Sequence, residues 1–220
     1  MPFTKVSVLI PTRNRVHRLR KVLESFDETV HQKDAELVFR IDDDDVASQQ
    51  FLHDQRVVVG PRYNGYDSMP TFFNEMHCVA AGDVLMCGND DMIFRTPDWS
   101  TRILEIANQY PDGLFDIGVS TLNQDHFPFA TVSRRVTNAL GFLWDPRIFW
   151  GDIFLRDVMQ VFDRCIMVPD VQIEHDWSGY SPDQVFVEAD KDIVRRRPNY
   201  WAEIHAAAVR DAVNTLKEKL

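Results

Sequence analysis

Residues 80–94 read AAGDVLMCGNDDMIF, a stretch in which an apolar run is followed by two adjacent aspartates. We predict a buried strand over Asp83–Cys87, because this run is short and continuously apolar. Ser68–Ala81, just before it, carries apolar residues at helical spacing. We therefore predict a helix there, with Ser68 as N-cap and Gly82 as C-cap. The predicted order is therefore a helix, then a strand, and then a turn that carries the two aspartates.

The same alternation runs through the first hundred residues. A helix is expected over Arg15–Asp27, and three more strands over Lys5–Ile10, Glu36–Ile41 and Arg56–Val59. Strands that alternate with helices indicate an α/β fold with a mostly parallel central sheet covered on both faces. Ligands of such sheets bind outside the carboxyl ends of the strands, so the residues that follow each strand are the first candidates for a site.

The second half of the chain is less regular. Apolar spacing predicts two helices and three short strands there: Trp99–Tyr110, Trp150–Arg164, Phe115–Val119, Phe129–Val132 and Val171–Glu174. The tail from Tyr200 onward has the spacing of an amphipathic helix. Such a tail can pack on its own domain, pair with a second copy in a homodimer, or touch a membrane surface, and its mixed charge favours the first. No linker separates the halves, so we expect one domain, with a donor-binding half over 1–95, an acceptor half over 96–199 and a C-terminal helix over 200–220.

Composition narrows the classes of function. The 220 residues carry a formal net charge of -10, and the basic residues are scattered, so nucleic acid is not the expected partner. No stretch reaches the roughly 18 apolar residues of a transmembrane segment, and the N-terminus lacks the pattern of a signal peptide. Cys78, Cys87 and Cys165 have no C-x-x-C spacing and stand in apolar stretches. We expect them to be reduced core thiols of a cytoplasmic protein.

Two groups of carboxylates follow two of the expected strands. Asp42–Asp45 form one group and Asp90–Asp91 the other. A solvated turn in which one aspartate caps a helix at Val46 is the plain structural explanation of the first group. Two groups at one sheet edge favour a metal site instead, since Mg²⁺ or Mn²⁺ binds one or two carboxylates together with substrate phosphates. A diphosphate held by that ion would explain how an acidic protein binds an anion.

Three segments together resemble glycosyltransferase family 2. VSVLIPTRNR (residues 6–15) is similar to the first strand of that family, RIDDDD (40–45) to the aspartate-bearing end of its second strand, and AAGDVLMCGNDDMIF to the segment that leads into its D-x-D motif. The resemblance covers residues 5–95 and is thin beyond them. It implies a GT-A fold, which is Rossmann-like, a nucleoside diphosphate sugar as donor, and inverting transfer of the sugar to a carbohydrate or other hydroxyl acceptor.

The resemblance also assigns roles to residues. Asp91 would bind the metal ion, Mn²⁺ or Mg²⁺, and Asn89 stands where the family often has an aspartate, which removes one charge. Asp42 or Asp43 would contact the base or ribose. The full set expected at the nucleotide sugar is Pro11, Thr12, Arg13, Arg15, Asp42, Asp43, Arg62, Asn89 and Asp90.

The second half of the chain contributes two candidate site residues, one for catalysis and one for metal binding. Asp152 follows Gly151 at the start of an expected helix, where the family places its catalytic base. The alternatives are that Asp152 only caps the helix, or that Asp157 or Asp145 is the base. His175 follows an expected strand and is either a second metal ligand or an ordinary histidine.

Two other segments of the second half have candidate roles. Ser178–Asp183 would be a lid over the site or a plain turn. Arg195–Arg197 would neutralise the diphosphate or form a solvated helix end.

Two other functions fit the same sequence. A nucleotidyltransferase also binds Mg²⁺ through carboxylates on an α/β sheet, but it would normally carry a glycine-rich phosphate loop after the first strand. The PTRNR segment at residues 11–15 contains no glycine. A non-catalytic module that binds nucleotides or carbohydrates could use the same fold without a base.

Overall fold

The computed structural model describes residues 1–30, 33–62, 68–121, 129–176 and 199–220. Its sheet begins with the four strands that the sequence predicts, all parallel and in the order β3-β2-β1-β4. Their bounds are Val6–Thr12 (β1), Ala35–Asp42 (β2), Arg56–Gly60 (β3) and Val84–Cys87 (β4). The helices between them are α1 (Val16–Thr29), α2 (Val46–Phe51) and α3 (Met69–Val79).

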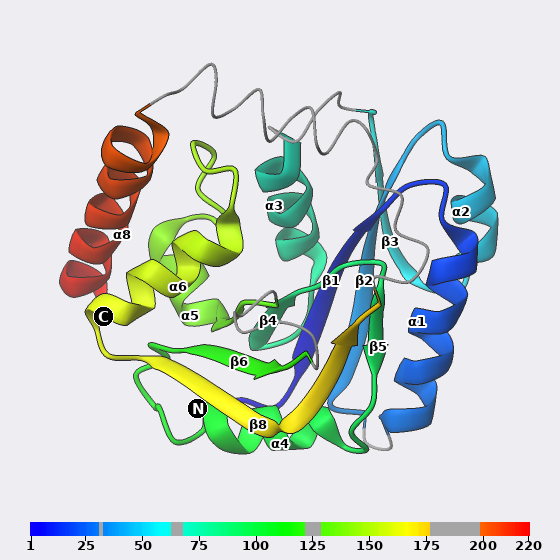
Figure 1. The fold of residues 1–220 in the computed structure, drawn as a ribbon, viewed down its shortest axis with the longest axis horizontal. Helices are drawn as coiled ribbons and strands as arrows, with labels where there is room; N and C mark the ends of the chain where they lie inside the picture. The colour runs from blue at the N-terminus through cyan, green and yellow to red at the C-terminus, as the bar shows by residue number, and fades with distance from the viewer. Residues whose placement is uncertain (31–32, 63–67, 122–128, 177–198) are drawn as a thin grey trace.

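The second half extends this sheet in the order β4-β7-β6-β8-β5. β7 (Thr131–Ser133) runs antiparallel to both β4 and β6 (Asp116–Ser120), and β8 (Cys165–His175) runs parallel to β6. β8 is much longer than the expected Val171–Glu174, because its first part pairs with β6 and its second part with β5 (Met92–Phe94). Figure 1 shows β8 curving from one partner to the other. The sequence did not indicate β5, which is only three residues long.

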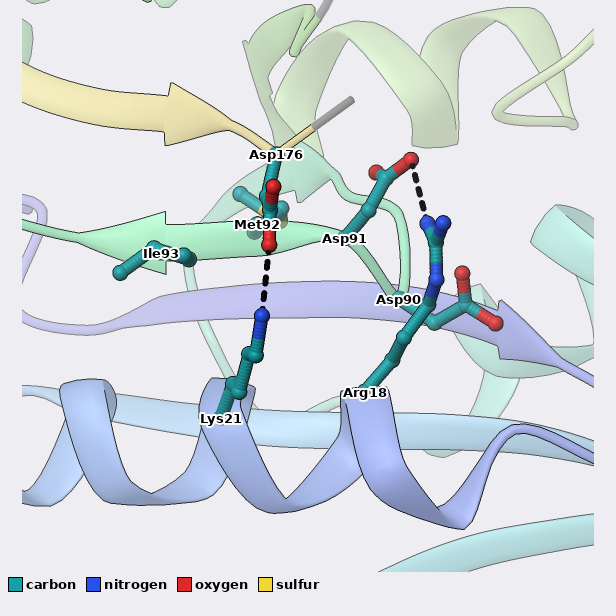
Figure 2. Close-up of a pocket in the computed structure, with 7 residues that line it drawn as sticks. All are labelled: Arg18, Lys21, Asp90, Asp91, Met92, Ile93 and Asp176. Atoms are coloured by element: carbon teal, nitrogen blue, oxygen red, sulfur yellow. Dashed lines mark hydrogen bonds and ion pairs between the residues drawn. The ribbon is translucent and has the colours of Figure 1, made fainter. Parts of the chain in front are cut away.

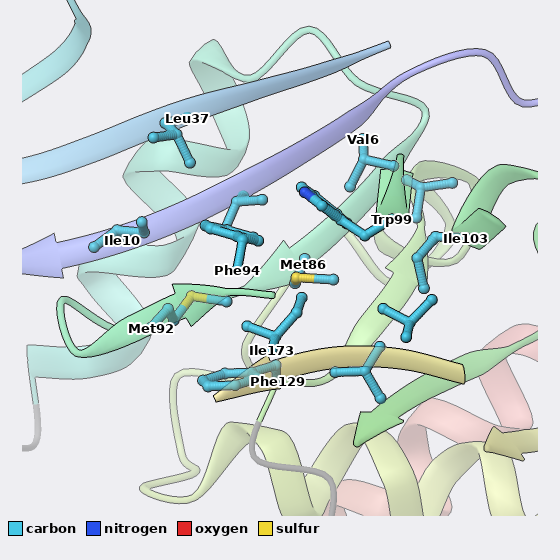
Figure 3. Packing of buried hydrophobic residues seen from close by; sticks show 14 of the residues in the cluster. Val6, Ile10, Leu37, Met86, Met92, Phe94, Trp99, Ile103, Phe129 and Ile173 are labelled. Carbon is cyan, nitrogen blue, oxygen red and sulfur yellow. The ribbon is translucent and has the colours of Figure 1, made fainter. Parts of the chain in front are cut away.

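Two hydrophobic clusters cover the two faces of the sheet. In β1, Val8 and Ile10 point into one cluster, and Leu9 points into the other, as period-two alternation requires. The first cluster is closed by α1 and α4 (Trp99–Ala107), and part of it is seen in Figure 3. The second is closed by α3, α5 (Arg134–Leu140), α6 (Gly151–Val161) and the tail. The sheet is therefore buried on both sides, and only its edges are open to a ligand.

The tail packs on the domain, as its mixed charge predicts. It consists of a π-helix, η2 (Tyr200–His205), continued by α8 (Ala206–Lys219), which lies against α5 and α6. Ala208 and Leu216 of α8 are buried in the second cluster. The backbone nitrogen of Phe149 donates to the Tyr200 hydroxyl at 2.8 Å, so the tail is fixed to the segment that precedes α6.

Two expectations about small residues are wrong. Gly82 is not the C-cap of α3, because the helix ends at Val79 and Ala80 is already extended. A Cβ atom on Gly82 would lie 2.7 Å from the backbone nitrogen of Ser7, so this glycine lets the chain pass close to β1. Cys87 is buried, but Cys78 is exposed and Cys165 is half-buried.

No helix among the described residues is both long enough and apolar enough to cross a membrane.

Candidate functional site

The two carboxylate groups meet at the carboxyl edge of the parallel strands, as the sequence predicts. β1 ends at Thr12 and β2 ends at Asp42, while the turn after β4 carries Asn89–Asp91. The Thr12 hydroxyl donates to Asp90 Oδ2 at 2.9 Å, which ties the end of β1 to that turn. This edge is where α/β sheets bind their ligands.

Asp90 is a buried carboxylate that holds this edge together. Besides Thr12, it accepts a hydrogen bond from Arg15 Nη1 at 3.0 Å. Burial raises the pKa of Asp90, while the charge of Arg15 and the hydrogen bond from Thr12 counteract this effect. Thr12, Arg15 and Asp90 were all expected at the nucleotide sugar, and the structure brings them together.

Asp91 and His175 are brought together by the short ladder between β5 and β8. Met92 lies opposite His175 in that ladder, and the backbone nitrogen of Asp176 donates to the Asp91 carbonyl at 2.8 Å. Asp91 Oδ1 consequently lies 3.0 Å from His175 Nε2, and both side chains are buried. The two residues predicted as metal ligands thus face each other.

These two side chains fit a divalent metal ion. Two ligand atoms at right angles on an octahedral ion, each about 2.1 Å from it, lie about 3.0 Å apart, and this equals the observed separation. Asp91 Oδ1 is buried and accepts no hydrogen bond from the described residues, and its ion-pair contact is with His175 Nε2. No group of three or more His, Cys, Asp or Glu side chains gathers around a metal position in the described part of the chain. The remaining ligands would be water or phosphate oxygens, as is usual for Mg²⁺.

Arg18 also binds Asp91, a contact that the sequence analysis did not find. Its Nη1 lies 3.2 Å from Asp91 Oδ2, and the guanidinium is almost as buried as the carboxylate. Figure 2 shows Arg18 and Lys21 reaching from α1 toward Asp91 and Asp176. The cleft that these residues line is small, much smaller than a typical ligand site.

Asp42, at the end of β2, is held by two arginines. Arg13 Nη1 and Arg40 Nη1 each donate to it at 2.8 Å. Arg40 is buried inside the sheet, donates to Glu75 at 2.8 Å, and lies over the ring of Phe72. Both oxygens of Asp42 are therefore engaged, and its side chain is fixed in one position.

The other three aspartates of this group have different roles. Asp43 is exposed at the edge. Asp44 pairs with Arg13, which holds the pKa of Asp44 below its usual range, and Arg62 Nη1 lies 3.7 Å from the same carboxylate. Asp45 caps α2 by accepting from the backbone nitrogen of Ser48 at 3.1 Å, so the plain structural explanation holds for this one residue.

Pro11 and Asn89, also expected at the nucleotide sugar, border the same edge. Pro11 is half-buried in β1, opposite Arg40 of β2. Asn89 is half-buried, and its carbonyl accepts from the backbone nitrogen of Met92 at 3.3 Å, which closes the turn around the two aspartates.

Asp152 lies in the first turn of α6 and is half-buried. Gly151 before it packs against Trp144 so closely that a Cβ atom would overlap the indole ring, which fixes where the helix begins. Burial raises the pKa of the Cys87 thiol, and the charge of Asp152 adds to this increase. Asp152 is therefore close to the end of β4, from which the chain runs into Asn89–Asp91.

A buried carboxylate that the sequence analysis did not single out lies beneath α6. Asp116 is fully buried, and its Oδ1 accepts from the backbone nitrogen of Thr131 at 2.9 Å. Burial raises the pKa of Asp116 to about 7, and the charge of Asp152 adds to this increase. Its Oδ2 accepts no hydrogen bond from the described residues.

The two alternative bases have structural partners. Asp157 lies 2.9 Å from His205 Nε2 and so joins α6 to the tail, while Asp145 is buried and binds the guanidinium of Arg147 at 2.7 Å. The lid expected over Ser178–Asp183 and the arginines Arg195–Arg197 lie outside the described residues.

This architecture matches solved glycosyltransferase structures. The mannosyltransferase PcManGT from Pyrobaculum calidifontis, in complex with GDP-Man and Mn²⁺, superposes on the whole chain with a TM-score of 0.63 at 14% identity, and 74% of its own length is covered. The fold is GT-A. S. aureus TarS 1–349 in complex with UDP-GlcNAc gives a TM-score of 0.59 at 14% identity over 86% of this chain and 65% of TarS 1–349. In another solved structure of S. aureus TarS, the match covers 40% of the TarS chain.

The sequence itself has no such match. No protein-family model matches it, and neither does any curated protein. The GT-A fold is therefore recognised through the arrangement of its strands and helices and not through overall identity.

Two arginines that organise this GT-A site were missed, although each left a signal in the sequence. Arg40 interrupts the apolar strand ELVFRI, and a charged residue in a buried strand needs a partner. Asp42, two residues later, points to the same face of that strand and is the partner. Arg18 follows Arg15 by three residues in the helix predicted over Arg15–Asp27, the spacing that places two side chains on one side of a helix.

Proposed function

We propose that this protein is a glycosyltransferase that moves a sugar from a nucleoside diphosphate sugar to an acceptor hydroxyl. The observation that carries the proposal is the approach of Asp91 and His175. They are far apart in the sequence, yet their ligand atoms lie 3.0 Å from each other on a GT-A fold. Solved structures that share this fold hold GDP-Man with Mn²⁺ in one case and UDP-GlcNAc in another.

In this proposal the donor lies over the carboxyl ends of β1, β2 and β4. Asp43 is exposed there and suits a ribose hydroxyl, while Asp42 is fixed by Arg13 and Arg40 and forms the floor beneath it. Arg15 and Arg62 add positive charge at an edge that must accept a diphosphate. Pro11, Thr12, Asn89 and Asp90 complete the wall of the nucleotide site.

Asp91 and His175 would hold the metal ion, Mn²⁺ or Mg²⁺. Carboxylate oxygen suits both ions, and imidazole nitrogen favours Mn²⁺. The bound ion would neutralise charge on the diphosphate leaving group.

Asp152 is proposed as the general base. It would take the proton of the acceptor hydroxyl while that oxygen bonds to the anomeric carbon and the bond from this carbon to the diphosphate oxygen breaks. The electron pair of the broken bond leaves with the nucleoside diphosphate. Attack from the side opposite the leaving group would invert the anomeric configuration; α6, which carries Asp152, covers the other face of the sheet from α1.

Thermal unfolding with GDP or UDP, each with and without Mn²⁺, tests the donor site. A ligand present at 100 times its Kd stabilises the folded state by about 2.7 kcal/mol. We expect a clear rise in Tm that requires both nucleotide and Mn²⁺, and Asp91→Ala should abolish it. No rise with either nucleotide would refute the function, while a persisting Mn²⁺-dependent rise in Asp91→Ala would identify Asp90 as the ligand.

The base is tested separately by transfer of the sugar from the donor. Asp152→Asn should leave the Mn²⁺-dependent rise in Tm intact but slow sugar transfer by about 10²- to 10⁴-fold. Asp27→Asn, an exposed change on α1, is the matched control and should alter neither readout. If Asp152→Asn transferred sugar at the wild-type rate, another residue would be the base.

A further inference from the structure

Three basic side chains, one just before α1 and two within it, each pair with a carboxylate of the site. Arg15 Nη1 lies 3.0 Å from Asp90, Arg18 Nη1 lies 3.2 Å from Asp91, and Lys21 Nζ lies 2.9 Å from Asp176. Arg18 and Lys21 lie on the same side of α1 because they are three residues apart, and Arg15 is the N-cap residue of that helix. The three carboxylates lie along a matching line, because Asp90 and Asp91 are adjacent and the backbone nitrogen of Asp176 donates to the Asp91 carbonyl. Figure 2 shows the second and third of these pairs.

The three pairs differ in burial. The side chains of Arg18 and Asp91 are 10% and 8% exposed, whereas that of Lys21 is 52% exposed. An exposed ion pair is screened by water and contributes little. A buried pair keeps most of its Coulomb interaction, because the surroundings are less polar than water. Arg18 is therefore the cation of this helix that acts most strongly on a proposed metal ligand.

The two oxygens of Asp91 face different partners. Oδ2 receives the Arg18 guanidinium, and Oδ1 faces His175 Nε2. Asp91 can thus bind an ion through Oδ1 while Arg18 remains on Oδ2, but the carboxylate charge is then shared between two cations. In addition, Arg15 balances Asp90, so the inner carboxylates carry no net negative charge of their own to attract a divalent ion.

A nucleoside diphosphate changes this balance. It brings several negative charges, which attract the metal ion and the arginines alike. We propose that Arg18 is a counter-ion that keeps divalent metal binding weak in the free protein and makes it depend on the diphosphate of the donor. This inference rests on the function proposed above, and it assigns Arg18 a role in the order of binding and not in the chemistry of transfer.

A purely structural role for Arg18 predicts the opposite effect on metal affinity. If Arg18 only oriented Asp91, its loss would leave the metal ligand misplaced, and Mn²⁺ would bind more weakly. If Arg18 opposes the ion, its loss would let Mn²⁺ bind more tightly. The sign of the change therefore separates the two roles.

The experiment measures Mn²⁺ binding without nucleotide, from the electron paramagnetic resonance signal of free Mn²⁺. In Arg18→Gln we expect the Kd for Mn²⁺ alone to fall at least about tenfold, which corresponds to 1.4 kcal/mol. The gain in Mn²⁺ affinity caused by GDP or UDP should shrink accordingly. Lys21→Gln, one step along the same helix, is the matched control and should change the Kd less than about twofold, as suits an exposed pair.

Weaker or unchanged Mn²⁺ binding in Arg18→Gln would overturn the inference, and so would an equal tightening in Lys21→Gln. Arg18→Lys keeps the charge and should stay close to the wild-type Kd. If Arg18→Gln did not fold, the wild-type protein would still decide, because Mn²⁺ affinity that is the same with and without GDP and UDP contradicts the proposal. If neither nucleotide bound with Mn²⁺ under any condition, the proposed function itself would fail, which is a different outcome from the loss of the Arg18 effect alone.

Discussion

Asp116 should make the stability of the protein fall as the pH rises. Burial raises the pKa of this carboxyl to about 7, from 3.8 for an unperturbed aspartate. The folded protein therefore keeps a proton that the unfolded chain has already released, and the free energy of unfolding must fall through this pH window. With these two pKa values, the loss between pH 5 and pH 8 is about 2 to 3 kcal/mol.

Asp116→Asn removes the titration while keeping the shape of the side chain. The amide oxygen can still accept from the backbone nitrogen of Thr131, as Oδ1 does now. Burying the amide group shifts the free energy of unfolding by the same amount at every pH, so the slope against pH is the readout. We expect the stability difference between variant and wild type to shift in favour of the variant by about 2 to 3 kcal/mol from pH 5 to pH 8.

Urea unfolding at pH 5, 6, 7 and 8 measures this slope directly. Asp27→Asn, at an exposed position of α1, serves as the control and should follow the wild type at every pH. Other groups titrate in both proteins, so their contributions to the pH dependence of stability cancel in the comparison. Identical slopes for Asp116→Asn and wild type would show that Asp116 loses its proton at the same pH in the folded and unfolded states, and the argument from burial would be refuted.

Two further changes test how the site is supported. Gly151→Ala places a methyl group where the Trp144 indole lies, so it should lower the free energy of unfolding by about 1 to 3 kcal/mol and slow transfer by moving the start of α6, as measured by urea unfolding and a transfer assay. Arg40→Met leaves the carboxylates of Asp42 and Glu75 without their buried partner, and it should cost about 3 to 5 kcal/mol in the same unfolding experiment. Full stability in either variant would contradict the packing described for it.

The strands that carry the site could be predicted from the sequence. β1, β2 and β4 are mostly apolar runs, and each is followed by polar residues. Because these strands are parallel, their carboxyl ends meet, and the meeting of Thr12, Asp42 and Asp90 follows from topology alone. The approach of His175 to Asp91 is harder to foresee, since it depends on β5, a three-residue strand that periodicity cannot reveal.

The division of roles within Asp42–Asp45 could not be predicted. The four residues are identical in type and adjacent in sequence, so no pattern separates them. Tertiary contacts do: Asp42 meets Arg40 from its own strand, Asp44 meets Arg13, and Asp45 meets the first turn of α2. The sequence therefore locates an acidic edge correctly but cannot say which carboxylates remain accessible to a ligand.

The acidic motifs are also less negative than their sequence suggests. The buried carboxylates Asp42, Asp90 and Asp91 each bind at least one arginine. Two carboxylate groups at one sheet edge were expected to favour a metal site, but the chain itself supplies arginines that compensate the buried carboxylates. In the proposed function, a diphosphate arrives at this edge with several further negative charges. The proposed metal ion would then serve the donor and not the fold, so we expect the protein to fold without it and to require it when the nucleotide binds.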